Sequence, residues 1–161
     1  NSRVYNSERE LAKLGCAHIH NKDDAQVLVG GMGMGYTLAA ALDCVAENAQ
    51  VTVAELIPEV VEWNQGALGE CAGKPLADSR CKIQLGDIAD LIKIQRPDFD
   101  AILLDVDNGP EGITNSNNDW LYSTTGIAAL YKCYAMQGCS QYGLPLQIPN
   151  SLHNLRKLDS Q

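Results

Sequence analysis

The fold of this chain is decided by the stretch Val27-Leu28-Val29-Gly30-Gly31-Met32-Gly33-Met34-Gly35. An apolar run ends there in a loop that holds four glycines, Gly30, Gly31, Gly33 and Gly35, and a helical pattern follows. Where a buried strand stops at a tight turn, glycines let the backbone approach a ligand closely. Glu55 ends the next apolar run, 20 positions after Gly35, where a carboxylate would accept hydrogen bonds from a ribose diol. The stretch therefore predicts a nucleoside pocket.

The spacing of the glycines separates one class of cofactor site from another. The fingerprint G-x-G-x-x-G of NAD-binding proteins would need glycine at position 36, which is Tyr36 here. The run is G-x-G-x-G instead, which resembles S-adenosylmethionine-binding folds. The sequence has no G-K-[ST] of the Walker type, so we do not expect nucleotide phosphate chemistry.

Length and composition indicate one ordinary globular domain. The chain has 161 residues, of which 45% are hydrophobic and 20% charged, enough for one core. Its net charge of −8 disfavours a nucleic-acid partner and is compatible with a cationic substrate. No apolar run approaches the length of a membrane span, and no basic-then-apolar leader opens the chain. We therefore expect a cytoplasmic protein without a membrane partner.

The cysteine and histidine residues give little indication of a metal site. The six cysteines lie far apart without C-x-x-C spacing, which favours reduced, buried thiols over a metal centre or a disulfide framework. His18 and His20 form an H-x-H pair, but no carboxylate or cysteine cluster accompanies them. We interpret both histidines as loop residues and expect no metal.

Strand and helix patterns alternate along the chain. The expected strands are 27–31, 51–56, 82–85 and 101–106, the expected helices are 7–16, 35–47, 58–68, 88–94 and 120–136, and the expected loops are 17–25, 69–80 and 107–118. Ser7 is predicted to be the N-cap of the first helix, and Gly126 to interrupt the last. The alternation implies parallel strands with right-handed crossovers, hence a doubly wound α/β sheet. The strands are nearly all apolar, as expected when helices cover both faces.

Acidic residues stand at the ends of successive strands. Glu55 ends the second strand, Asp87 follows the third, and Asp105 lies near the end of the fourth. Ligands of doubly wound sheets bind beyond the carboxyl ends of the strands, so Asp87 and the neighbouring Ile88 would hold an adenine ring. Each acid could instead cap a helix or hold a turn. Three acids at successive strand ends, together with the glycine loop, favour a ligand site.

Asp105 stands where it could reach a reacting group, and Asp107 lies close by. Two nearby carboxylates can bind an amine cation or remove its proton. The composition of Asp107-Asn108-Gly109-Pro110 fits a simple turn equally well, and both interpretations stay open.

Taken together, the motifs resemble the spermidine synthase family, and more closely bacterial spermidine synthase-like proteins. The resemblance runs from about Ser7 to Gly138. It rests on 27–37, on Val53-Ala54-Glu55-Leu56-Ile57-Pro58-Glu59-Val60-Val61-Glu62-Trp63, on Leu85-Gly86-Asp87, on Asp100-Ala101-Ile102-Leu103-Leu104-Asp105-Val106-Asp107-Asn108-Gly109-Pro110-Glu111, and on Leu121-Tyr122-Ser123. It implies a Rossmann-like S-adenosylmethionine-dependent methyltransferase fold, with an adenosyl-binding domain over 1–138 that is incomplete at both ends.

The resemblance also implies an activity. Aminopropyltransferases of this family use decarboxylated S-adenosylmethionine to alkylate an amine such as putrescine, and they are commonly oligomeric. The residues that match their functional positions are Gly31, Glu55 and Asp87 for the adenosyl group, Asp105 for binding and deprotonating the amine, and Asp107 and Tyr122 for binding it. The family's paired aspartates are separated by two small residues, whereas only Val106 separates the pair here. A methyltransferase that uses S-adenosylmethionine itself and an inactive adenosyl-binding fragment therefore remain alternatives.

The segment 139–161 breaks the alternation of strands and helices. It has no clear period and holds two prolines where a doubly wound domain should place another buried strand. Permitted codons for 138–148, read from the last base of the glycine codon, can encode the apolar strand L-F-A-V-W-S-A-T-P-D. We therefore expect a frameshift near Cys139. Family members begin with a small β-rich domain that nothing in this sequence matches, and we expect Asn1 to lie just past that domain.

Overall fold

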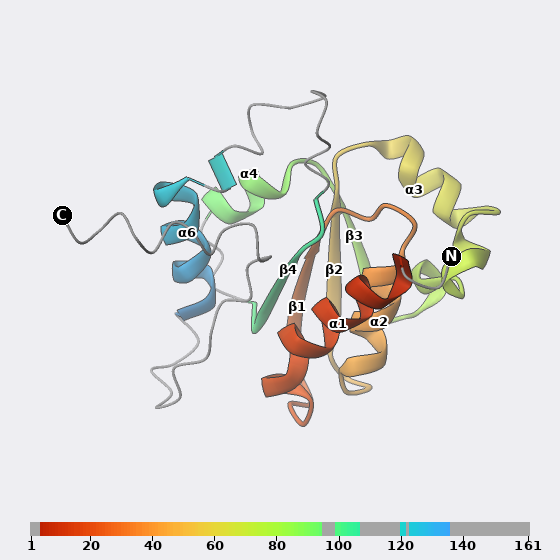
Figure 1. Cartoon of the computed structure of the whole chain (residues 1–161), viewed down its shortest axis with the longest axis horizontal. Helices are drawn as coiled ribbons and strands as arrows, with labels where there is room; N and C mark the ends of the chain where they lie inside the picture. The colour runs from red at the N-terminus through yellow and green to blue at the C-terminus, as the bar shows by residue number, and fades with distance from the viewer. Residues whose placement is uncertain (1–3, 95–98, 107–119, 122, 136–161) are drawn as a thin grey trace.

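The computed structural model describes residues 4–94, 99–106, 120–121 and 123–135. Within them a sheet of parallel strands forms the centre of the molecule (Figure 1), in the order β3-β2-β1-β4. The strands are β1 (Gln26–Gly30), β2 (Gln50–Glu55), β3 (Cys81–Leu85) and β4 (Ala101–Leu104). The order starts from a central β1, moves outward through β2 to β3 and returns to β4 on the other side. This confirms the predicted doubly wound parallel sheet.

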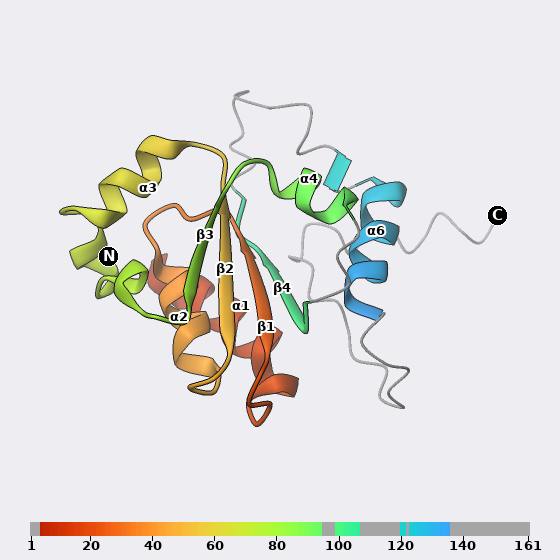
Figure 2. The same cartoon turned by 180° about the vertical axis from the view of Figure 1, so that it is seen from behind.

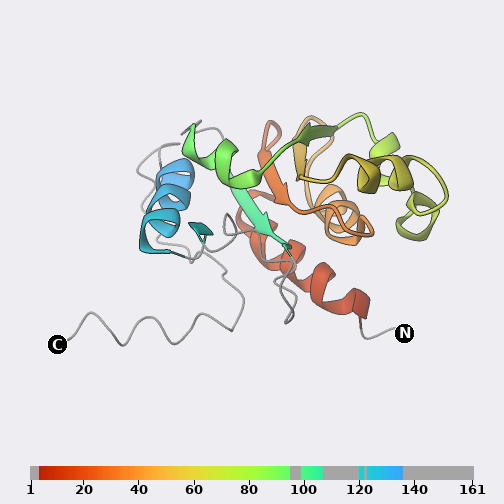
Figure 3. The ribbon, with the colours of Figure 1, turned by 90° about the horizontal axis from the view of Figure 1, so that it is seen from above.

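Helices cover the two faces of the sheet. One face carries α1 (Val4–Cys16) and α2 (Tyr36–Cys44), and the other carries α4 (Ile88–Lys93) and α6 (Thr124–Ala135), as Figures 1 and 2 show. Viewed from above, the sheet lies between these two layers (Figure 3). A further helix, α3 (Pro58–Gln65), follows the carboxyl end of β2. The described residues also include three short 3₁₀ helices, η1 (Ala17–Ile19), η2 (Gly69–Ala72) and η3 (Pro75–Ala77).

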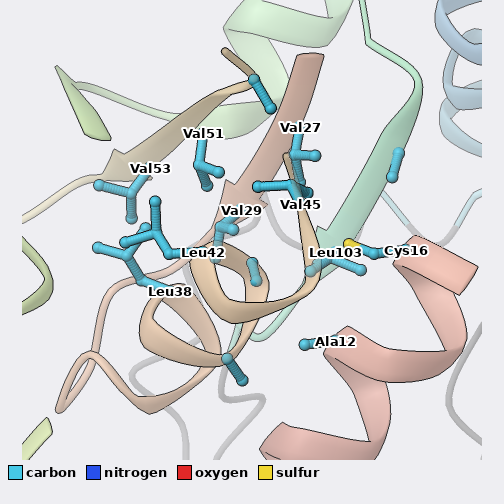
Figure 4. Close-up of a cluster of buried hydrophobic side chains, with 14 of the residues drawn as sticks. Ala12, Cys16, Val27, Val29, Leu38, Leu42, Val45, Val51, Val53 and Leu103 are labelled. Atoms are coloured by element: carbon cyan, nitrogen blue, oxygen red, sulfur yellow. The ribbon is translucent and has the colours of Figure 1, made fainter. Parts of the chain in front are cut away.

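The larger core lies between the sheet and the layer formed by α1 and α2 (Figure 4). Alternate residues of β1 and β2 point into it, because successive side chains of a strand face opposite sides of the sheet. The labelled members of this core are Ala12, Cys16, Val27, Val29, Leu38, Leu42, Val45, Val51, Val53 and Leu103. A second core on the opposite face joins Leu28 and Ala54 to α4 and α6. Residues of β1 and β2 thus contribute to a core on each face of the sheet, as expected for strands between two layers of helices.

β3 departs from that expectation. It forms an edge of the described sheet, and its side chains from Lys82 to Leu85 are exposed. Ile83 and Leu85 share the face on which Cys81 packs against the larger core, but α1 and α2 do not cover them. The apolar pattern of a strand therefore does not show that it is buried, because burial depends on the strand's place in the sheet.

Several predicted boundaries are wrong. α1 already includes Val4, so Ser7 lies inside the helix and is not its N-cap. The predicted loops 17–25 and 69–80 contain η1, η2 and η3. The last helical region breaks before α6 rather than at Gly126, because Ser123 caps α6 by accepting a hydrogen bond from the Gly126 N–H at 3.1 Å. Gly126 sits in the first turn of α6, where a Cβ would collide with the carbonyl oxygen of Trp120.

Three predictions fall on residues outside the described ones: the loop 107–118, Tyr122 and the segment 139–161. Among the described residues, no helix is both long and apolar enough to cross a membrane.

Candidate functional site

The candidate site lies at the carboxyl edge of the sheet. All paired strands run parallel, so their carboxyl ends meet at one edge. The glycine loop (residues 30–35) follows β1, Glu55 ends β2, Asp87 follows β3 and Asp105 follows β4. Backbone hydrogen bonds continue past the strands, from Asp105 N–H to the Gly30 carbonyl at 2.8 Å and from Gly86 N–H to the Glu55 carbonyl at 2.9 Å. The structure thus gathers the predicted acids around the glycine loop.

The glycine loop needs its glycines for two physical reasons. Gly31, Gly33 and Gly35 have φ of 85°, 49° and 82°, in the left-handed region that favours glycine. A Cβ on Gly31 would also lie 2.5 Å from the carbonyl oxygen of Asp105, and one on Gly30 would collide with the Ile88 side chain. The loop therefore lies directly against the backbone that carries Asp105.

Glu55 ties this loop to the end of β2. Its Oε2 accepts a hydrogen bond from Met32 N–H and its Oε1 accepts one from Ile57 N–H, both at 2.9 Å. The side chain is buried, with 8% of its surface exposed. Each carboxylate oxygen can accept more than one hydrogen bond, so capacity for ligand hydroxyls remains. Two backbone N–H groups of the chain therefore orient this carboxylate.

Asn64, which was not predicted from the sequence, fixes the other side of the loop. From α3, its Nδ2 donates to the carbonyl oxygens of Gly33 and Val60, both at 2.9 Å. Its Oδ1 is buried with no hydrogen-bond partner among the described residues, although burying an unpaired acceptor costs about 1–3 kcal/mol. One signal for Asn64 was present in the sequence: it lies three positions after Val61, so the two side chains share one face of the helix, and both are buried.

Asp87 is the N-cap of α4. Its Oδ1 accepts a hydrogen bond from Ala89 N–H at 2.8 Å, so the capping role left open for this acid is present. The Ile88 side chain is buried in the second core beneath Gly30. What Ile88 presents at the edge is its backbone N–H, which belongs to the helix-terminal donors without an intrahelical acceptor. The adenine contacts predicted for both residues stay a prediction.

Asp105 is exposed, and a buried hydroxyl orients it. Thr37 Oγ1 donates a hydrogen bond of 2.5 Å to Asp105 Oδ2, across 68 positions of sequence. Thr37 stands in the first turn of α2, directly after the glycine loop, and only 1% of its surface is exposed. Thr37 was not predicted, because the only signal for it in the sequence is its place two residues after Gly35. Asp107, the predicted partner of Asp105, lies outside the described residues.

The three carboxylates of this edge have no cationic partner in the part of the chain that the structure describes. The ion pairs found there involve other acids, and the side chains of Glu55, Asp87 and Asp105 accept from neutral N–H or O–H groups. No group of three or more potential metal ligands occurs among these described residues. The arrangement leaves negative charge available for hydroxyl or ammonium donors of a ligand.

The predicted H-x-H pair lies away from this edge. Nε2 of His18 is 2.8 Å from the Asp100 carbonyl oxygen, and Nδ1 of His20 is 3.2 Å from the Cys44 carbonyl oxygen. Asp100 precedes β4, and Cys44 ends α2, so both contacts lie near the amino-terminal ends of the strands. The two histidines contact different parts of the backbone.

Comparison with known proteins gives structural but no sequence relatives. No protein-family profile and no curated protein sequence matches the chain. Its structure is similar to a spermidine synthase in complex with the transition-state analogue AdoDATO (TM-score 0.61, 19% identity) and to spermidine synthase from Thermotoga maritima (TM-score 0.62, 20% identity). It is also similar to human methyltransferase-like protein 13 in complex with SAH (TM-score 0.56, 19% identity).

The chain spans less than two thirds of each of these proteins. The likeness covers 80%, 80% and 81% of this chain, but 39%, 40% and 59% of the respective relatives. At such low identity the likeness defines the fold alone. The parallel sheet, its strand order and these neighbours together show that the chain has a Rossmann-like methyltransferase fold.

Proposed function

We propose that the protein is a transferase that binds an adenosyl sulfonium co-substrate and passes one of its alkyl groups to an amine. One observation supports this proposal above all. Glu55 is hydrogen-bonded to the glycine loop, and the exposed Asp105 lies directly beside that loop. A nucleoside site and an exposed carboxylate next to it are the two parts that such a transfer needs.

In this proposal Glu55 accepts hydrogen bonds from the ribose hydroxyls. Its carboxylate is already oriented by two backbone N–H groups, so little ordering is needed on binding. The glycines at 30, 31, 33 and 35 let the adenosyl group approach the backbone. The remaining acceptor capacity of Asp87 and the N–H of Ile88 serve the adenine ring, at the end of β3.

Asp105 acts on the amine. The ammonium form is attracted to the exposed carboxylate, which then accepts a proton as the nitrogen becomes a nucleophile. The nitrogen lone pair attacks the carbon bonded to the sulfonium, a C–N bond forms, and the C–S bond breaks. The bonding electrons go to sulfur, which leaves as a neutral thioether. Asp107 and Tyr122 are the proposed additional contacts of the amine.

The donor we favour is decarboxylated S-adenosylmethionine, with an amine such as putrescine as acceptor. Two spermidine synthases are among the similar structures, and an acidic chain of net charge −8 suits a polycationic substrate. The product would then carry a new aminopropyl group. We further propose that the protein works in the cytoplasm, as a homo-oligomer, without a metal, membrane or nucleic-acid partner.

A second candidate is methyl transfer from S-adenosylmethionine. The specific observation in its favour is the Asp105-Val106-Asp107 spacing, which lacks the two-residue separation of the polyamine-binding family. The glycine loop, Glu55 and Asp87 serve both donors equally, and human methyltransferase-like protein 13 shares the fold. The donors differ in a carboxylate, so binding distinguishes them.

The deciding experiment is calorimetric titration of the folded protein with each donor in turn. Preference for decarboxylated S-adenosylmethionine supports aminopropyl transfer, and preference for S-adenosylmethionine supports methyl transfer. Glu55→Ala is the matched negative variant, and Glu59→Ala, on the exposed side of α3, controls for the loss of one charge. If neither donor binds to the folded protein, the adenosyl site is refuted, whereas binding without product from any amine would favour an inactive adenosyl-binding fragment.

A further inference from the structure

We propose that Thr37 is a positioning residue for the transfer step, acting through the carboxylate of Asp105; this rests on the proposed function. Among the described residues, the Thr37 hydroxyl is the sole hydrogen-bond donor to that carboxylate, with Oγ1 and Oδ2 2.5 Å apart. Nothing else in this part of the chain fixes the rotation of the carboxylate about its Cβ–Cγ bond.

The two partners differ sharply in their freedom. Thr37 is fully buried, in a helix that packs into the larger core, and a β-branched side chain in a helix has few rotamers. Asp105 is exposed and follows the last residue of β4, so its side chain would otherwise sample several orientations. A rigid donor therefore holds a mobile acceptor.

The consequence for the reaction is geometric. With Oδ2 bound to Thr37, the other carboxylate oxygen, Oδ1, keeps its full acceptor capacity and a defined direction. An amine bound to Oδ1 would approach the glycine loop from a fixed position, because the Asp105 N–H also donates a hydrogen bond to the Gly30 carbonyl oxygen. Small misplacements of a reacting group cost large factors in rate, so the fixed direction matters for turnover.

Removing the Thr37 hydroxyl should leave binding of the adenosyl group unchanged. The contacts that orient Glu55 come from the N–H groups of Met32 and Ile57, and the contact that holds Gly33 comes from Asn64. None of them involves the Thr37 hydroxyl. A structural role of Thr37 would disturb donor binding and turnover together, whereas a positioning role lowers turnover alone.

The test compares Thr37→Val, which removes the hydroxyl at nearly constant shape, with Thr37→Ser, which keeps it. Product formation is measured with putrescine and each of the two donors. We expect kcat to fall roughly 10- to 100-fold in Thr37→Val and to stay within about threefold in Thr37→Ser, with donor affinity unchanged in both. Equal kcat in wild type and Thr37→Val, or equal losses in both variants, would overturn the proposal.

A second measurement uses Asp105→Asn as background. If Thr37 acts through Asp105, adding Thr37→Val to Asp105→Asn lowers kcat no further, whereas independent roles would multiply the two losses. Should Thr37→Val fail to fold, Thr37→Ala takes its place in the same cycle. A wild-type protein that binds a donor but forms no product refutes the proposed function and this inference with it. An active wild type matched by an equally active Thr37→Val refutes the inference alone.

Discussion

Carboxylates at the two ends of the sheet are held in opposite ways. At the amino-terminal end, Asp100 is nearly buried, accepts from Gln26 N–H at 2.8 Å and pairs with Lys22 at 2.6 Å. Asp78, just before β3, pairs with Arg80 at 2.7 Å. These negative charges are cancelled by cations of the chain itself.

At the carboxyl end the donors are neutral. Two backbone N–H groups hold Glu55, the N–H of Ala89 holds Asp87, and the Thr37 hydroxyl holds Asp105. A nearby cation balances the charge of an ion-paired carboxylate, whereas neutral donors leave the negative charge of a carboxylate without a counter-charge. The comparison separates an end whose acids form ion pairs within the chain from an end whose acids form none among the described residues, and the proposed function places the ligand at the second end.

Of the substitutions that compare the two ends of the sheet, Asp105→Asn should have the largest effect. If Asp105 accepts the proton of the amine, the amide should lower kcat by about 10²–10⁴-fold, the usual contribution of a positioned base. Donor affinity and the midpoint of urea unfolding should stay near wild type, because the residue is exposed. Asp23→Asn, an exposed position at the amino-terminal end, makes the same change of charge as a control. An active Asp105→Asn would remove this residue from the transfer.

Gly31→Ala tests how closely the carboxyl end is packed. The new Cβ would meet the carbonyl oxygen of Asp105 and adopt a left-handed φ, so we expect a loss of about 3 kcal/mol in the free energy of unfolding. Gly33→Ala shares the positive φ but has open space around it, which predicts a loss of about 1–2 kcal/mol. Urea unfolding of both variants measures the difference. Equal losses would mean that the loop and Asp105 can move apart without cost.

How much of the fold and of the candidate site could be predicted depends on how far apart in the sequence the contacting residues lie. The strands, the glycine loop and Glu55 follow from local patterns, namely apolar runs, glycine spacing and an acid at a strand end. Thr37 and Asn64 were missed because their partners lie 68 and 31 positions away, and a single sequence does not show which polar residues will meet.

The same limit explains why the exposure of β3 was not predicted and why two roles stayed open for Asp87. The strand over 82–85 was expected to be covered on both faces, yet the order of strands leaves Ile83 and Leu85 exposed at an edge, which no local pattern reveals. Asp87 fitted both a cap and a ligand contact, because capping and ligand binding select the same side chain at the same place.

Asp100→Asn should destabilise the protein at the amino-terminal end of the sheet and leave the candidate site unchanged. The amide still accepts from Gln26 N–H but loses its ion pair with Lys22, which predicts a loss of about 1.5–3 kcal/mol in the free energy of unfolding. Donor binding by the folded protein should be unchanged, since the residue precedes β4 at the opposite end of the sheet. Urea unfolding and calorimetry measure the two quantities, with Asp23→Asn as the matched control. A loss of donor affinity at full stability would contradict the division of roles.

The smallest expected effect is a dependence on pH at Asp78. Hydrogen bonds from Arg80 hold the pKa of this carboxyl below its ordinary value of 3.8. A carboxyl whose pKa is lowered by folding stabilises the folded state above its unfolded pKa, and that stabilisation is lost as the pH falls through the lower, folded pKa. The pair is partly exposed, so its contribution stays below about 1 kcal/mol.

Asp78→Asn should therefore be less stable than wild type by the same small amount at pH 7 and pH 5. Below about pH 4 the difference should shrink, because the wild-type carboxyl then takes up a proton and comes to resemble the amide. Urea midpoints of both proteins across this range measure it. A difference that persists unchanged at pH 2 would show that Asp78 acts through the shape of its hydrogen bonds to Arg80. The cation would then not be what distinguishes this end of the sheet from the other.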